Sequence, residues 1–270
     1  MTKLMQRIIT AVVLVAVLLL VFFVLPPVAG IGVLGFFVVV AAWEWSGFLA
    51  LHALGPRLAY VAALVALLAG LLAFFPDRGA LMPLLWLSLA WWLCAFIWVM
   101  RYPTPIRRDV GAFCGFLVIV PAWVGIVTLI EAGDNGPAYV LFVLAMVWAA
   151  DIGAYFVGRR FGRTKLAPSV SPGKTWEGLI GGLIAAAVTA ACGALWFDES
   201  PIVLVPLGLA VGAISVVGDL TVSMFKRNAG LKDSGNLFPG HGGVLDRVDS
   251  VTAAVPLFVF AFVRLGLFQN

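Results

Sequence analysis

The stretch Val110-Gly-Ala-Phe-Cys-Gly-Phe-Leu-Val-Ile-Val-Pro-Ala-Trp-Val-Gly-Ile-Val-Thr-Leu-Ile130 contains no charged side chain. A helix of about 20 apolar residues is long enough to cross a hydrocarbon core of roughly 30 Å, and all its backbone hydrogen bonds are internal. The stretch therefore predicts a membrane-spanning helix.

Further apolar runs of similar length fill most of the remaining chain. They cover approximately residues 8–25, 30–51, 58–75, 81–100, 138–157, 179–197, 202–217 and 251–268. Hydrophobic residues make up 63% of the 270 residues, and the mean hydropathy is +1.10, whereas soluble domains are only about 45 to 50% apolar. The runs are continuous, unlike the alternating strands of a membrane barrel. We therefore predict an all-α, polytopic transmembrane helical bundle of about nine membrane-spanning helices.

The beginning of the chain allows a second interpretation. The first run follows Lys3 and Arg7, as in a secretory signal peptide, but it is long and no convincing small-x-small cleavage site follows it. We therefore interpret it as a span. Pro26 and Pro27 separate it from the second run, because proline cannot donate a backbone hydrogen bond, and they predict a short hairpin.

The positions of the basic residues predict the topology. With a cytoplasmic amino terminus, nine crossings leave only Arg78 and Arg264 near the outer side, as the positive-inside rule requires. We therefore expect the polar connections and the active site to face the cytoplasm. The predicted division is residues 1–76 with three helices, 77–134 with two helices and a possible dimer contact, and 135–270 with four catalytic helices. The net charge of +4 fits contact with anionic headgroups, and no nucleic-acid motif is visible.

Carboxylates gather in the long inner connection predicted over residues 218–250. Asp246 and Asp249 are three residues apart, so at the start of the last helix they would share one face, with about 5 to 6 Å between their β-carbons. Magnesium prefers hard oxygen ligands, typically one or two carboxylates together with water and substrate phosphates. We therefore predict that Asp219, Asp246 and Asp249 bind Mg²⁺. The alternative is that they cap a helix or pair with nearby cations.

Cations accompany these carboxylates. Lys226, Arg227 and Lys232 can neutralise phosphate oxygens, although each alone also fits an ordinary inner loop of a membrane protein. Gly242 and Gly243 have no side chains, so a phosphate can approach their backbone N–H groups, although Gly-Gly alone would predict a turn. We expect the preceding histidine, His241, to contact the substrate.

The other polar connection, residues 158–178, contains Ser171, Lys174 and Thr175. The sequence around them resembles the end of a Walker A loop, but the required glycine spacing and the preceding strand are missing. We predict hydroxyl and ammonium contacts to a nucleotide triphosphate, or capping of the seventh helix. Glu44 lies inside an apolar run and needs a partner. It either packs against an inner-loop arginine or takes part in catalysis, and the sequence leaves this open.

The inner connection also fits one pattern throughout: Ser-x-apolar-Lys-Arg, four residues, Lys-Asp, then His-Gly-Gly-x-x-Asp-Arg-x-Asp. The residues that fill it are Ser223, Lys226, Arg227, Lys232, Asp233, His241, Gly242, Gly243, Asp246, Arg247 and Asp249. This pattern resembles the signature of the integral-membrane phosphatidate cytidylyltransferases, also called CDP-diacylglycerol synthases. The segments Asp-x-Gly-Ala-Tyr and Ser-Pro-x-Lys-Thr-x-Glu-Gly also look like this family. The resemblance covers about residues 151–250, whereas the earlier part matches only by hydropathy and a Trp-Glu pair.

The resemblance implies a homodimer that uses Mg²⁺ and converts CTP and the membrane lipid phosphatidic acid into CDP-diacylglycerol and pyrophosphate. The residues that we expect to act in catalysis are Asp219, Asp246, Asp249, Lys226 and His241. Those that we expect to bind substrates are Ser171, Lys174, Thr175, Ser223, Arg227, Lys232, Asp233, Gly242, Gly243 and Arg247.

Two other functions remain as alternatives. A CTP-dependent lipid or polyprenol kinase would share the nucleotide, the lipid and the membrane. A membrane transporter would commonly have a binding site at the bilayer midplane and weak internal repeats, whereas here the charges gather at one face and no repeat is evident. The CDP-alcohol phosphotransferases need the denser pattern Asp-x-x-Asp-Gly-x-x-Ala-Arg, which we do not find.

Overall fold

The computed structural model describes residues 3–74, 82–238, 240 and 242–267. In these residues the elements are α1 (Lys3–Phe23), α2 (Pro27–Phe48), α3 (Leu54–Phe74), α4 (Met82–Arg101), α5 (Arg108–Ile130), α6 (Gly136–Phe161), β1 (Lys165–Ala167), β2 (Ser171–Thr175), α7 (Trp176–Trp196), α8 (Pro201–Asn228) and α9 (Leu245–Leu265). Helices α2 to α9 are each long and apolar enough to cross a membrane, and α1 covers the first apolar run. The prediction of an all-α, polytopic bundle is confirmed.

The predicted hairpin between the first two helices is also confirmed. Helix α1 ends at Phe23, and α2 begins at Pro27. Proline fits the first helical position because the N–H group that it lacks would have no partner inside the helix there.

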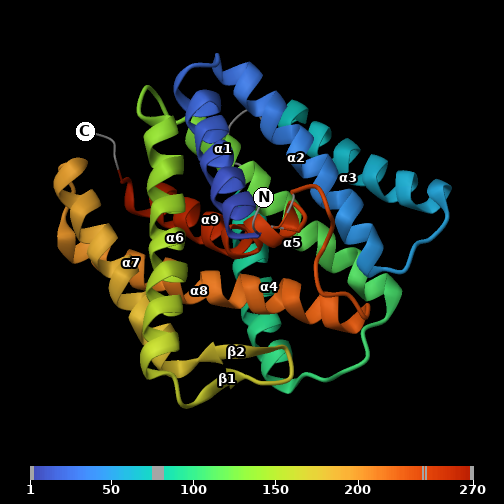
Figure 1. The fold of residues 1–270 in the computed structure, drawn as a ribbon. Helices are drawn as coiled ribbons and strands as arrows, with labels where there is room; N and C mark the ends of the chain where they lie inside the picture. The colour runs from blue at the N-terminus through green and yellow to red at the C-terminus, as the bar shows by residue number, and fades with distance from the viewer. Residues whose placement is uncertain (1–2, 75–81, 239, 241, 268–270) are drawn as a thin grey trace.

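The helices around the polar connections pack closely because small residues line their contacts. Helices α6 and α7 lie together on one side of the molecule, α2 and α3 lie on the other, and α8 extends from α6 and α7 across the molecule (Figure 1). A β-carbon on Gly182 of α7 would lie 2.6 Å from the carbonyl oxygen of Ala150 in α6, and one on Gly153 would lie 2.7 Å from the carbonyl oxygen of Gly181. Such close backbone approach is typical of membrane helix interfaces, where lipid supplies no hydrophobic drive for helix association.

Large aromatic side chains fix the N-terminal helices against the rest of the bundle. Trp45 of α2 is fully buried, and its indole N–H donates to the carbonyl oxygen of Gly111 in α5 over 2.9 Å. Its ring also packs on that of Phe225 in α8, with 4.9 Å between the centroids. Trp45 therefore ties α2 to both α5 and α8.

Helix α8 extends beyond its apolar run, and this corrects one sequence-based prediction. We predicted a connection from residue 218 onward, but the helix continues to Asn228. Asp219, Ser223 and Lys226 are therefore helical, at positions i, i+4 and i+7 of one face. Hydropathy identifies the part of a helix that lipid can surround, and it does not detect a polar extension that is buried by other helices.

A short antiparallel hairpin of strands β1 and β2 connects α6 and α7. The backbone N–H groups of Arg163 and Thr164 donate to the Glu177 carboxylate at 3.1 and 3.2 Å, closing the base of the hairpin. The Thr175 hydroxyl accepts the N–H of Gly178 over 3.1 Å and so caps α7, as one of our two predictions for this segment required.

Candidate active site

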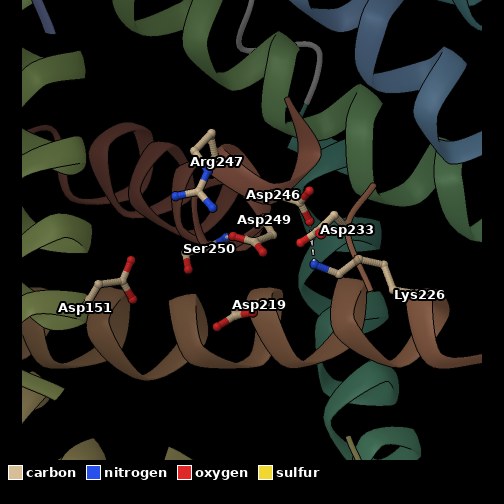
Figure 2. Close-up of a pocket in the computed structure, with 8 residues that line it drawn as sticks. All are labelled: Asp151, Asp219, Lys226, Asp233, Asp246, Arg247, Asp249 and Ser250. Atoms are coloured by element: carbon tan, nitrogen blue, oxygen red, sulfur yellow. Dashed lines mark hydrogen bonds and ion pairs between the residues drawn. The ribbon is translucent and has the colours of Figure 1, made fainter. Parts of the chain in front are cut away.

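A pocket of about 300 Å³ opens between α6, α8 and the start of α9 (Figure 2). Its lining residues are Asp151, Asp219, Lys226, Asp233, Asp246, Arg247, Asp249 and Ser250. The structure therefore brings the three predicted metal-binding aspartates to one cavity, although they come from two helices.

Close contact between α8 and α9 places two of these carboxylates together. A β-carbon on Gly218 would lie 2.5 Å from the carbonyl oxygen of Asp249, so only glycine allows the helices to approach this closely. Asp219, the next residue, then faces the pocket together with Asp249 (Figure 2). The Asp249 side chain is buried and accepts the backbone N–H of Ser250 over 2.8 Å.

Asp246 is held by the protein through both of its oxygens. Oδ1 lies 2.6 Å from Nζ of Lys226, and both side chains are almost fully buried. Oδ2 accepts the backbone N–H groups of Ser234 at 2.7 Å and Gly243 at 3.0 Å, and the hydroxyl oxygen of Ser234 lies 3.0 Å from it. The alternative that an aspartate pairs with a nearby cation is thus what the structure shows for Asp246.

Asp219 joins the two polar segments of the chain. Its carboxylate forms an ion pair with Lys174 of strand β2 and accepts the Ser223 hydroxyl over 3.2 Å. The side chains of Lys174 and Asp219 are 25% and 26% exposed, so both remain accessible to a ligand. Lys174 therefore reaches the pocket's edge from the hairpin, although it is far from Asp219 in sequence.

Some residues that we predicted to bind substrate lie elsewhere. Thr175 caps α7, and Ser171 pairs with Ala167 in the hairpin. The guanidinium of Arg227 donates to the carbonyl oxygens of Val170 at 3.4 Å and Leu231 at 3.0 Å. None of these, nor the exposed Lys232, lines the pocket.

The signature glycines are used for the turn before α9. Gly242 has a φ of +79°, a left-handed conformation that favours glycine. The N–H of Gly243 donates to Asp246, so it binds a protein carboxylate where we expected a phosphate. His241, which we predicted to contact the substrate, lies outside the described residues.

Sequence reasoning missed several members of this region. Asp151 on α6 lines the pocket, and the available signal was a lone carboxylate inside an apolar run. Ser234 contacts Asp246, but a serine in a polar loop carries no comparable signal. Within the described residues, no group of three or more His, Cys, Asp or Glu side chains is arranged to hold a metal ion. The metal role of the aspartates stays a prediction.

Comparison with known proteins agrees with the signature residues. The sequence pattern of the cytidylyltransferase family matches residues 5–265. A phosphatidate cytidylyltransferase of Pseudomonas aeruginosa is 44% identical over 260 residues, which cover 94% of each chain. One from Haemophilus influenzae is 39% identical over 289 residues, covering 95% of this chain and 98% of the relative. The chain thus belongs to the cytidylyltransferase family.

Proposed function

We propose that this nucleotidyltransferase is a phosphatidate cytidylyltransferase, which transfers CMP from CTP to phosphatidic acid and releases pyrophosphate. The observation that carries the proposal is the pocket, where carboxylates of α6, α8 and α9 lie beside the ammonium groups of Lys174 and Lys226. Such a site can bind phosphate groups and a cation while the surrounding apolar helices stay in lipid. The names of the relatives from Pseudomonas aeruginosa and Haemophilus influenzae supply the lipid substrate.

The chemistry requires little acid–base catalysis. The phosphate monoester of phosphatidic acid has a second pKa of about 6, so it is largely ionised near neutral pH. One of its oxygens attacks the α-phosphorus of CTP, a new P–O bond forms, and the bond to the oxygen that bridges the α- and β-phosphates breaks. The electron pair leaves with pyrophosphate. The protein therefore has to position the substrates and neutralise their charge.

Three cations of the chain suit that task. Lys174 and Lys226 are already oriented toward the pocket by Asp219 and Asp246, and a lysine ammonium is a compact charge that can bind phosphate oxygens. Arg247 lines the same pocket, and its planar guanidinium can bind a phosphate through two parallel hydrogen bonds. We assign the binding of the triphosphate and the release of pyrophosphate to these residues.

The carboxylates suit a magnesium ion. Asp246 already accepts hydrogen bonds from Lys226 and from two backbone N–H groups of the loop before α9. Asp219 and Asp249 accept fewer hydrogen bonds from the protein, so they are the better pair of ligands. Two carboxylates together with water and substrate phosphates form a usual magnesium set. When bound, magnesium supplies charge neutralisation at the phosphate oxygens. Asp246 would then hold Lys226 and the loop in place.

We place the pocket at the cytoplasmic face. The ends of α6 and α8 beside it carry Arg159, Arg160, Lys226 and Arg227, and such basic ends are retained on the inner side of a membrane. CTP is soluble in the cytoplasm, and the acyl chains of phosphatidic acid can remain in the bilayer during the reaction.

Labelled nucleotide tests the proposal directly. Detergent-purified protein is incubated with phosphatidic acid, Mg²⁺ and CTP labelled at the α-phosphate, and the lipid is extracted. We expect label in the lipid and phosphatidate-dependent release of pyrophosphate. A lipid kinase would place γ-phosphate label in the lipid and leave the α-phosphate label in the aqueous phase. That result, or pyrophosphate release that does not require the lipid, would rule the proposal out.

A further inference from the structure

Glu44 is a buried carboxylate on the apolar helix α2, and its partners lie about 200 positions later in the chain. The residue is 5% exposed. Its Oε1 accepts the backbone N–H of Val244 at 2.9 Å, and its Oε2 accepts the N–H of Leu245 at 2.8 Å and the hydroxyl of Ser234 at 2.8 Å. The partners of Glu44 in the described structure are therefore hydrogen-bond donors of the loop before α9 and of the first residue of α9. The nearby Arg57 donates to Ser46 and to the carbonyl oxygen of Trp43.

The two hydrogen bonds from Val244 and Leu245 are at the start of α9, where a carboxylate is favoured. The first N–H groups of a helix have no partner inside the helix, and the helix dipole attracts negative charge there. Leu245 is the first residue of α9, and Val244 precedes it. Glu44 therefore caps α9 from a different helix.

Ser234 extends this contact to the pocket. Its hydroxyl lies 2.8 Å from Oε2 of Glu44 and 3.0 Å from Oδ2 of Asp246, and its backbone N–H also donates to Asp246. Asp246 in turn pairs with Lys226 of α8. A continuous series of hydrogen bonds thus runs from α2 through Ser234 to the Asp246–Lys226 pair.

The loop is shaped to receive the Glu44 side chain. A β-carbon on Gly235 would lie 2.5 Å from Oε1 of Glu44, and one on Gly243 would collide with the Glu44 carboxylate and the Ser234 hydroxyl. The backbone of α2 at Glu44 is also held in place, because the indole N–H of the adjacent Trp45 donates a hydrogen bond to the carbonyl oxygen of Gly111. A positioned group needs this kind of rigid support from its surroundings.

We infer that Glu44 is a positioning residue, which fixes Ser234, Val244 and the start of α9 so that Asp246 stays paired with Lys226 at the pocket. This inference rests on the proposed function of that pocket. Glu44 itself does not line the pocket with Asp246, so its effect on turnover passes through Ser234 and the turn before α9.

The first test compares Glu44→Gln and Glu44→Ala with the unchanged protein. Displacement of reacting groups by about 1 Å can cost roughly 100-fold in rate, so we expect kcat of Glu44→Ala to fall by about 10- to 100-fold with a smaller change in the KM for CTP. Glu44→Gln keeps one acceptor oxygen, so its kcat should fall less than that of Glu44→Ala. Hydrogen exchange at the amides of Val244 and Leu245 should accelerate in both variants.

A double-mutant cycle separates positioning from general support of the fold. Glu44→Gln and Ser234→Ala interrupt the same series of hydrogen bonds, so the double variant should lose about as much kcat as the more damaged single variant. Independent effects would multiply, as they do for residues that share no contact. The control is Asp109→Asn, which removes a carboxylate from the exposed pair with Arg107 and should leave kcat and loop exchange unchanged.

Each outcome decides the inference. Unchanged kcat in both Glu44 variants would overturn it. So would a double variant whose loss of kcat is the product of the two single losses, if amide hydrogen exchange at Val244 and Leu245 is also unchanged. If Glu44→Ala does not fold, Glu44→Gln and Ser234→Ala still complete the cycle. Failure of the proposed function is a separate result, because the unchanged protein would then leave α-phosphate label out of the lipid while the exchange measurement still reports on the loop.

Discussion

Among the single residues of the pocket, Asp219, Lys226 and Asp246 already have partners of opposite charge. Lys226 and Asp246 are 8% and 5% exposed in their side chains, and Asp219 pairs with Lys174. Breaking a buried pair leaves one charge uncompensated, which costs far more than breaking a pair in water. A change to only one member of the buried Lys226–Asp246 pair should therefore lower stability as well as activity.

We predict that Asp246→Asn abolishes turnover and also destabilises the protein. Loss of one partner of a buried ion pair typically costs about 3 to 5 kcal/mol, here because Lys226 remains buried without its counter-charge. Thermal unfolding in detergent and the labelled-CTP assay measure the two effects. Replacing both residues, as Lys226→Met with Asp246→Leu, should recover the part of the stability lost to the unpaired lysine charge, but no turnover. Near-normal activity of folded Asp246→Asn protein would contradict the assigned role.

Asp219 and Asp249 should behave differently from Asp246. We expect EDTA to stop turnover and Mg²⁺ to restore it, because two carboxylates with substrate phosphates form a magnesium site. Asp219→Asn and Asp249→Asn should each raise the Mg²⁺ concentration needed for half-maximal rate. The measurement is a titration of initial rate against Mg²⁺ at fixed CTP. Full activity in EDTA would remove the metal from the proposal.

At the scale of secondary-structure elements, glycines determine how closely the helices that form the pocket can approach each other. Gly218 lies against the backbone of Asp249, and this contact sets the spacing between α8 and α9. The hairpin of β1 and β2 contributes Lys174, which pairs with Asp219 at the pocket. The pocket therefore depends on helix spacing as much as on the identity of the side chains in it.

We predict that Gly218→Ala lowers both activity and stability. The added methyl group would force α8 and α9 apart, and overpacking of this kind costs typically about 1 to 3 kcal/mol. The matched control is Gly70→Ala on α3, where a β-carbon meets nothing within 4 Å. Because alanine is the better helix residue, that change should leave activity intact and stabilise slightly, by roughly 0.5 to 1 kcal/mol. Equal behaviour of the two variants would show that the α8–α9 spacing does not matter.

Sequence patterns predicted some of these elements and missed others for physical reasons. Continuous apolar runs located the membrane helices, because crossing lipid demands both length and low polarity. The start of α9 at Leu245 lies before the apolar run that we predicted over residues 251–268, and we considered a helix at Asp246 and Asp249 only as the condition for them to share a face. The continuation of α8 to Asn228 was missed because a buried polar helix face does not differ from a polar loop in hydropathy. The strands of the hairpin are only three and five residues long, too short for an alternating pattern.

The site was predicted less completely than the fold. The sequence analysis grouped Asp219, at the end of an apolar run, with Asp246 and Asp249 of the signature, and the structure places all three in one pocket. No local pattern could reveal that Lys226 pairs with Asp246, or that Glu44 meets Val244. Such contacts depend on how helices distant in sequence pack against each other, which a single sequence does not show.

At the scale of the whole molecule, the polar connections described here gather at one end of an apolar bundle. The hairpin, the end of α8 and the start of α9 lie together there. This arrangement suits an enzyme that takes one substrate from water and the other from the membrane. The resemblance to the phosphatidate cytidylyltransferases adds a homodimer, which stays a prediction.

We predict that this end of the bundle faces the cytoplasm. Single cysteines are introduced at the exposed positions Lys165 and Asp134, in a background where Cys94, Cys114 and Cys192 are replaced by alanine. In intact spheroplasts, a membrane-impermeant maleimide should label Asp134→Cys and leave Lys165→Cys unlabelled. Permeabilised membranes should show labelling of both. Labelling of Lys165→Cys in sealed spheroplasts would reverse the topology.

The hydrogen bonds from Glu44 to Val244 and Leu245 limit how the chain can be divided into modules. The complete signature lies after residue 150, so a truncated minimal enzyme or a chimera with foreign leading helices would keep every signature residue. It would nevertheless lack the Glu44 carboxylate, which caps the start of the last helix, α9. Engineering of this protein should therefore transplant α2 together with the signature, even though the two are separated by more than half of the chain.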